Sequence, residues 1–245
     1  MRLQFIGCGD AFGSGGRFNT CLHLTGAQTN VLIDCGATSM VAMQRLGIDR
    51  AAIDAILLTH FHGDHFGGIP FFMLDAQLIS RRERPLTIAG PPSLRERFVQ
   101  VMDAAFPGSS ATKNRFDLNF VEMQPGQATR IGALRVTPFH VVHDDRAGPC
   151  LALRIEAEGR TIAYSGDTEW TDSLIEAAHG ADLFVCECYT YERPVRAHLA
   201  LKVLEQNLAR MAPKRLVLTH MSADMLGRLG EVAHETAEDG KIVEI

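Results

Sequence analysis

The chain has 245 residues, of which 46% are hydrophobic and 22% charged, with a formal net charge of −5. These values predict an ordinary globular protein with a substantial core, and the acidic balance argues against a protein that coats nucleic acid by bulk electrostatics. The sequence contains neither an apolar run of 18 residues nor a signal-peptide pattern, so we expect a cytoplasmic protein without a membrane span.

Cysteine usage favours the same compartment. The six cysteines are scattered and lack the spacing of a disulfide framework. A chain of this length does not need disulfides, so we expect reduced thiols. Cys186 and Cys188 form a Cys-X-Cys pair, which supplies half of a metal site at most.

The first part of the chain alternates short strands with helices. Strands are predicted at residues 2–7, 21–26, 30–36, 55–60 and 86–91, and helices at 38–48, 64–82 and 93–106. Within the segment 64–82, Gly67 and Gly68 are weak points for a helix.

The second part repeats this plan from residue 116 onward. Strands are predicted at 116–123, 133–142, 150–159, 160–168, 181–189 and 215–220, and helices at 171–180, at 197–211 and just before the closing residues 241–245. Each half runs from strands into mixed strand and helix. This pattern favours an α/β fold, an αββα sandwich in which two mixed β-sheets pack face to face with helices outside, formed by one domain over residues 1–245.

One turn contains several polar side chains whose burial would cost free energy. The segment "LLTHFHGDHFGG" places His60, His62, Asp64 and His65 within six positions, directly after a buried strand. His60 and His62 would point to the same side of an extended backbone. Gly63 is expected to allow a sharp turn that brings Asp64 and His65 back toward that side. Burying these groups would be expensive without a cation, so the segment predicts a metal site.

The motif "THFHGDHFGG" resembles the His-X-His-X-Asp-His signature of the metallo-β-lactamase superfamily. Later segments follow in the order typical of that superfamily: "VVHDD", "AYSGDTEW", "ADLFVCE", "AHLAL" and "LVLTHMS". The resemblance implies two divalent metal ions, zinc in the first place and manganese or iron as alternatives. It implies one ion on His60, His62 and His143, a second on Asp64, His65 and His220, and Asp167 bridging both.

Two assignments rest on position along a strand. His140 competes with His143, but the two would point to opposite faces of a strand, and His143 stands where the strand gives way to "DDRAGP". Asp34, at the end of "NVLID", is interpreted as a buried carboxylate that orients a ligand histidine, with a strand-end turn as the alternative.

Within the superfamily, the N-terminal "FIGCGDAFGSGGRFNTCLHL" and the segment "GGIPFFMLDAQLISRRERPLTIAGPPS" are similar to ribonuclease Z-like phosphodiesterases. This resemblance implies a hydrolase in which a dinuclear centre activates a bridging hydroxide. It further implies that Glu187 orients His198, that His198 protonates the leaving oxygen, and that Asp64 serves catalysis as well as metal binding.

Three departures weaken transfer RNA as the substrate. The residues between Gly90 and His140 leave no room for the flexible RNA-gripping arm of ribonuclease Z, "HLAL" replaces an expected Ser/Thr after His198, and "LALR" replaces an expected "GYR". We therefore expect a small phosphodiester, such as a cyclic nucleotide, or a short RNA end, with no DNA or membrane partner. The resemblance also suggests a homodimer. The alternatives are an ester, lactone or thioester hydrolase on the same centre, and a non-catalytic metal-binding or carrier protein.

Overall fold

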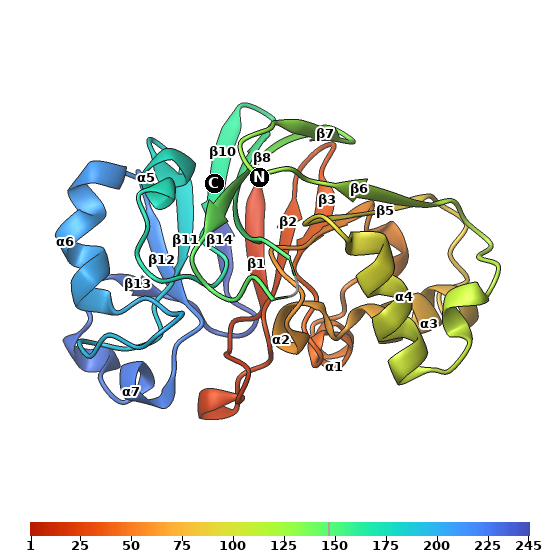
Figure 1. Ribbon diagram of the computed structural model, residues 1–245, viewed down its shortest axis with the longest axis horizontal. Helices are drawn as coiled ribbons and strands as arrows, with labels where there is room; N and C mark the ends of the chain where they lie inside the picture. The colour runs from red at the N-terminus through yellow and green to blue at the C-terminus, as the bar shows by residue number, and fades with distance from the viewer. Residues whose placement is uncertain (147) are drawn as a thin grey trace.

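The computed structural model describes residues 1–146 and 148–245, and its centre is a pair of seven-stranded sheets (Figure 1). The first sheet has the strand order β14-β1-β2-β3-β4-β5-β6. Its strands are β1 (Arg2–Gly7), β2 (Cys21–Thr25), β3 (Asn30–Ile33), β4 (Ala55–Leu57), β5 (Leu86–Gly90), β6 (Leu118–Glu122) and β14 (Ile242–Glu244). Strands β3 to β6 run parallel, whereas β14, β1, β2 and β3 pair antiparallel, so the sheet is mixed.

The second sheet has the order β13-β12-β11-β10-β9-β8-β7. Its strands are β7 (Thr129–Ile131), β8 (Leu134–Val141), β9 (Cys150–Ala157), β10 (Arg160–Tyr164), β11 (Leu183–Glu187), β12 (Leu216–Thr219) and β13 (Glu235–Thr236). It is antiparallel from β7 to β10 and parallel from β10 to β13. The parallel strands of both sheets require crossover connections, and helices supply most of them.

Helices cover the outer faces of both sheets. The first sheet carries α1 (Ser39–Arg45), α2 (Gly63–Phe66), α3 (Ile69–Leu78) and α4 (Leu94–Ala105), and the second carries α5 (Ser173–Ala178), α6 (Leu201–Met211) and α7 (Ala223–Leu226). Single-turn helices lie at Ser14–Gly16 (η1), Arg50–Ala52 (η2), Ser109–Ala111 (η3) and Leu229–Glu231 (η4). The predicted αββα sandwich is confirmed.

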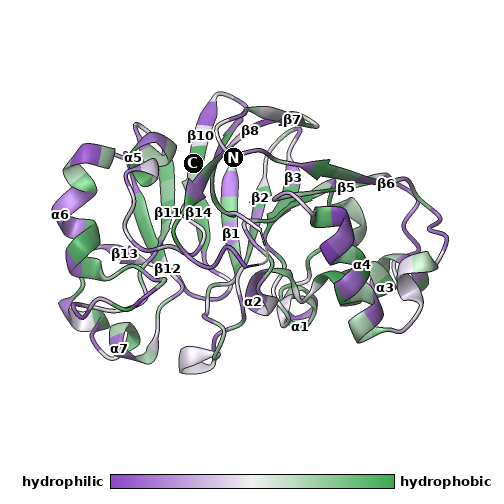
Figure 2. Ribbon diagram, viewed as in Figure 1, coloured by the Kyte–Doolittle hydropathy of each residue, from purple (hydrophilic) through white to green (hydrophobic). Residues whose placement is uncertain are grey.

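Three hydrophobic clusters match these layers. One fills the space between the sheets and includes Phe5, Leu22, Leu153 and Val185, while the other two lie beneath the helices of each sheet. The hydropathy colouring shows apolar residues along the strands, with hydrophilic stretches on β1, β8 and β10, and both kinds of residue on α4 and α6 (Figure 2). Burial on both faces explains why several strands read as continuous apolar runs.

Several predicted boundaries are wrong. The helix expected over 64–82 is split into α2 and α3 at Gly67 and Gly68, and it ends at Leu78. A Cβ at Gly68 would overlap the carbonyl oxygen of Gly36, so this break brings two backbones into close contact. The helix expected over 197–211 begins only at Leu201.

The two halves of the sequence are also less separate than predicted. Strand β6, expected to open the second half, pairs with β5, and the C-terminal β14 pairs with β1, so both belong to the first sheet. Between Gly90 and His140 the chain forms α4, η3, β6, β7 and most of β8, and this described segment holds no extended arm. Among the described residues, no helix is both long and apolar enough to cross a membrane. All six cysteines are buried and free.

Candidate metal centre

The predicted ligands meet at one end of the two sheets, where the strands give way to loops. The segment after β4 supplies His60 and His62, and α2 supplies Asp64 and His65. The remaining three come from the second sheet: His143 follows β8, Asp167 follows β10, and His220 follows β12. Residues up to 160 positions apart in sequence are therefore brought together by the packing of the two sheets.

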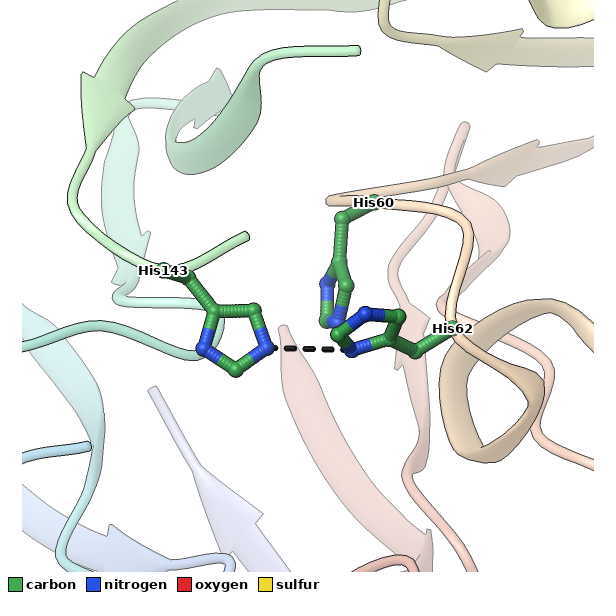
Figure 3. A group of neighbouring side chains, drawn as sticks. All are labelled: His60, His62 and His143. Atoms are coloured by element: carbon green, nitrogen blue, oxygen red, sulfur yellow. Dashed lines mark hydrogen bonds between the residues drawn. The ribbon is translucent and has the colours of Figure 1, made fainter. Parts of the chain in front are cut away.

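Three imidazoles form the first group (Figure 3). The ring of His60 lies with its centroid 4.7 Å from that of His62 and 5.0 Å from that of His143. Nε2 of His143 is 3.0 Å from Nδ1 of His62. This edge of the cluster is more open, because the His62 side chain is 38% exposed.

Two carboxylates and two imidazoles form the second group, and all four residues are buried. Nε2 of His65 lies 3.4 Å from Asp64 Oδ2 and 3.2 Å from Asp167 Oδ1. Nε2 of His220 lies 3.2 Å from Asp64 Oδ2 and 3.3 Å from Asp167 Oδ2. The donor atoms of the four side chains therefore converge on one point.

Asp167 connects the two groups. Its Oδ2 is 3.9 Å from Nε2 of His143 in the first group, while the same carboxylate contacts His65 and His220 in the second. A single carboxylate in this position is adjacent to both sets of donors. This is the placement that a bridging ligand requires.

Hydrogen bonds behind the cluster orient the imidazoles. The buried Asp34 carboxylate accepts a hydrogen bond of 2.7 Å from His65 Nδ1, and it also accepts from the Thr59 amide at 2.8 Å and from the Thr59 hydroxyl. The Thr59 hydroxyl in turn lies 3.0 Å from His60 Nδ1. With their Nδ1 atoms engaged, both rings turn Nε2 toward the cluster. The orienting role predicted for Asp34 therefore has a direct contact with His65.

A backbone carbonyl holds the third imidazole. His143 Nδ1 donates a hydrogen bond of 2.6 Å to the carbonyl oxygen of Ala197, which leaves Nε2 as the free donor atom. His140 has no part in the cluster, because it is exposed and pairs with Asp145 at 3.0 Å. The structure thus brings His143, and not its rival, beside His60 and His62.

The donor set fits divalent metal ions. His60 Nε2 is buried and has no hydrogen-bond partner among the described residues. Burial and the neighbouring imidazoles lower the pKa of His60, which keeps its ring neutral. The nitrogens of His62 and His143, 3.0 Å apart, would repel each other as lone pairs unless a proton or cation lay between them. Imidazole and carboxylate donors in this arrangement suit zinc, manganese or iron.

A second buried pair adjoins the cluster. Glu187, at the end of β11, is fully buried and lies 3.2 Å from Nδ1 of His198. Burial alone would lower the pKa of His198, but the hydrogen bond and charge of Glu187 outweigh it and raise that pKa to about 9. His198 also groups with His143 and Asp167 as a third set of potential donors. It lies in the loop before α6, not at the start of the helix as predicted.

Some contacts of the site were not predicted from the sequence. Thr59 links Asp34 to His60, and only its place beside a ligand could have drawn attention to it. Tyr189, two residues after Glu187, stacks on His198 with ring centroids 4.4 Å apart. Asp144 faces His62 Nε2 at 3.5 Å. The turn at Gly63 does not itself require glycine, because Gly63 lacks a positive φ and a Cβ there would meet no atom within 4 Å.

Comparison with known proteins identifies the family. The model of the family described as "Anti-Pycsar protein Apyc1" matches residues 1–237. The chain belongs to this family. It is also 28% identical to the ribonuclease Z of Geobacillus kaustophilus, with 93% of this chain and 90% of that protein covered. That alignment runs over 282 positions, more than the 245 residues present here, so the relative has residues that this chain lacks.

Solved structures agree on the fold. The short form of human tRNase Z superposes with a TM-score of 0.81 at 23% identity, covering 100% of this chain and 99% of the other. A diphosphatase from the PhnP family superposes with a TM-score of 0.77 at 20% identity, covering 100% and 97%. Together with the ribonuclease Z relatives, this fold confirms the resemblance to the ribonuclease Z-like branch of the metallo-β-lactamase superfamily, and the chain is a metal-dependent hydrolase of the phosphodiesterase type.

Proposed function

We propose that this chain hydrolyses a small phosphodiester, a cyclic nucleotide in the first place and a short RNA end in the second. The observation that carries the proposal is the pair of donor groups joined by Asp167, with the Glu187–His198 pair directly beside them. Two divalent ions, zinc by preference, held by His60, His62 and His143 and by Asp64, His65 and His220, would activate water and offset charge on the phosphate.

The protein side chains have distinct tasks in this scheme. Asp34, Thr59 and the Ala197 carbonyl fix the imidazole rings, so the donor atoms need little reorganisation when a cation binds. His198, held by Glu187 at Nδ1, is left with Nε2 to deliver a proton to the departing oxygen. Asp64 serves both the second donor group and the alignment of His220.

Two features favour a small substrate over transfer RNA. The segment between Gly90 and His140 consists of α4, η3, β6, β7, most of β8 and short connections, so it offers no long arm to grip a folded RNA. The formal net charge of −5 gives no general attraction for a polyanion. One domain, a cytoplasmic location and a homodimer stay predictions that accompany this proposal, as does the absence of DNA and membrane partners.

A matched pair of histidine variants provides the test. Protein loaded separately with zinc and with manganese would be assayed on cyclic nucleotides and on bis(para-nitrophenyl) phosphate, alongside measurement of bound metal. We expect His143→Ala to lose metal and turnover, because it removes one of three imidazoles of the first group. His140→Ala, an exposed neighbour outside the cluster, should keep both.

The outcomes separate the candidate functions. Turnover of the diesters that depends on His143 and not on His140 supports the phosphodiesterase. A metal-loaded protein inert toward every diester but active on esters, lactones or thioesters would transfer the same centre to another bond. Metal binding without any turnover would favour a carrier.

A further inference from the structure

The loop between β1 and β2 exposes a phenyl ring. Phe12 is 82% exposed, more than any other large hydrophobic side chain in the described chain. A ring so fully in contact with water contributes nothing to the core. A single exposed aromatic side chain is common on protein surfaces, and it indicates a function only when the residues around it do so as well. Here the surroundings are a rigid loop beside the metal centre.

A buried carboxylate holds this loop in shape. Asp10 has no exposed surface, and its Oδ1 accepts hydrogen bonds from the backbone N–H of Phe12 at 3.2 Å and of Ser14 at 2.9 Å. Its Oδ2 accepts from the Ser14 hydroxyl at 2.7 Å. The Asn19 amide donates to the carbonyl oxygen of Asp10 at 2.9 Å and closes the loop. Phe12 is therefore presented from a fixed backbone.

One end of the loop contacts a residue of the metal centre directly, and the other end does so through Gly36. The carbonyl oxygen of Cys8 accepts a hydrogen bond of 3.0 Å from the N–H of His220. At the other end, Asn19 packs against Gly36, which in turn lies against the carbonyl oxygen of Asp64. The loop also packs, through η1, against α7, which begins three residues after His220. Figure 1 shows the loop at the lower edge of the molecule, at the same end as α2 and α7.

We propose that Phe12 is a specificity-determining residue, whose ring stacks against the nucleobase of a nucleotide diester bound at the metal centre. The inference rests on the proposed phosphodiesterase function and names its substrate class. Every nucleobase offers a flat π-face, so an aromatic ring can hold the base without reading its identity. The rigid loop reduces the ordering cost that a mobile aromatic would add. A diester that lacks a base gains nothing from Phe12.

Two diesters with the same leaving group test this role. The para-nitrophenyl ester of thymidine monophosphate and methyl para-nitrophenyl phosphate undergo the same chemical step and differ in the nucleoside. For Phe12→Ala we expect KM for the thymidine ester to rise roughly tenfold relative to the methyl ester, with little change in the ratio of kcat values. Phe12→Tyr should restore the KM ratio, and Phe12→Leu should restore only part of it.

A second aromatic provides the control. Phe71 on α3 is 45% exposed and packs edge-on against Phe106 with centroids 5.4 Å apart, outside the donor groups of the centre. Phe71→Ala should leave the ratio of the two KM values as it is in the parent protein. Binding of thymidine monophosphate, measured by calorimetry, should weaken by the same factor in Phe12→Ala and so provides a readout independent of turnover.

Each result has a separate meaning. Failure of the parent protein to hydrolyse either ester would contradict the phosphodiesterase function itself. Hydrolysis of both esters with an equal change of KM in Phe12→Ala would overturn the stacking role alone. A change of oligomeric state in Phe12→Ala with an unchanged KM ratio would also overturn it, because the ring would then belong to a protein interface.

Discussion

The buried Glu187 offers a sharp perturbation of the site. Its Oε1 accepts from the Thr168 N–H, its Oε2 accepts from the Leu199 N–H at 3.3 Å, and both oxygens lie within 3.3 Å of His198 Nδ1. Every contact of the carboxylate thus comes from a donor. Glu187→Gln keeps the size of the side chain but turns an amide NH2 toward one of these donors.

The structure sets the size of the expected effect. A buried donor left without an acceptor costs about 1–3 kcal/mol of folding stability, which a protein of this size can tolerate. Without the carboxylate, the pKa of His198 should fall from about 9 toward the ordinary histidine value. If His198 donates the proton to the leaving oxygen, the variant should lose roughly two to four orders of magnitude in rate.

The assay depends on the leaving group. A cyclic nucleotide releases a strongly basic alkoxide that needs a proton, whereas a para-nitrophenyl diester releases a weak base that leaves without one. Glu187→Gln and His198→Ala should therefore lose most of their activity on the cyclic nucleotide and far less on the para-nitrophenyl ester. Metal content, measured in parallel, should stay near that of the parent protein.

The pH profile gives a second, independent readout. A raised pKa means that His198 carries its proton over a wider range, and activity on the cyclic nucleotide is lost as the pH rises through that pKa. Glu187→Gln lowers the pKa, so this alkaline limb should move to lower pH. Equal losses on both substrates, together with an unmoved alkaline limb, would refute the proton-donor role and leave Glu187 and His198 with a purely structural one.

Two further predictions concern residues behind the metal ligands. Asp34→Asn keeps an acceptor for His65 Nδ1 but removes its charge, so zinc affinity, measured by competition with a chelator, should fall roughly 10- to 100-fold; unchanged affinity would contradict the orienting role. Gly36→Ala should displace Asp64, because a Cβ there would overlap its carbonyl oxygen; we expect loss of metal from the second donor group, while Gly230→Ala, where φ is not positive and a Cβ meets nothing within 4 Å, should retain both metals.

The metal motif could be predicted from sequence because its information is local. His60, His62, Asp64 and His65 stand in one turn, and their crowding has no explanation in packing alone. The assignment of His143 over His140 also depended on local position, at the point where β8 ends. The alternation of strands and helices likewise predicted the αββα layers.

Long-range pairing could not be predicted in the same way. Strand β14 joins β1 across nearly the whole chain, and its three residues carry no signal that would choose one sheet over the other. The contacts that orient the imidazoles are equally non-local: the carbonyl that fixes His143 belongs to Ala197, 54 residues away, and any residue type supplies a carbonyl. Helix α6 begins later in the chain than predicted because residues 197–200 contact the site instead of forming the first turn of the helix.

The backbone itself shows where this fold departs from local preference. Asp34, Ala197 and His220 all have left-handed conformations, with φ of 59°, 71° and 55°. Such a conformation costs non-glycine residues of order 1–3 kcal/mol each, and it persists only where the surroundings hold it in place. All three contribute directly to the centre: a carboxylate behind His65, a carbonyl behind His143, and an imidazole facing Asp64. Glycine would adopt these conformations more cheaply, but at positions 34 and 220 it would remove the functional group. Three of the seven non-glycine residues with positive φ in the described chain therefore lie where the donor atoms must be fixed before a cation binds, and there the strained backbone serves the preorganisation that a hydrolytic centre requires.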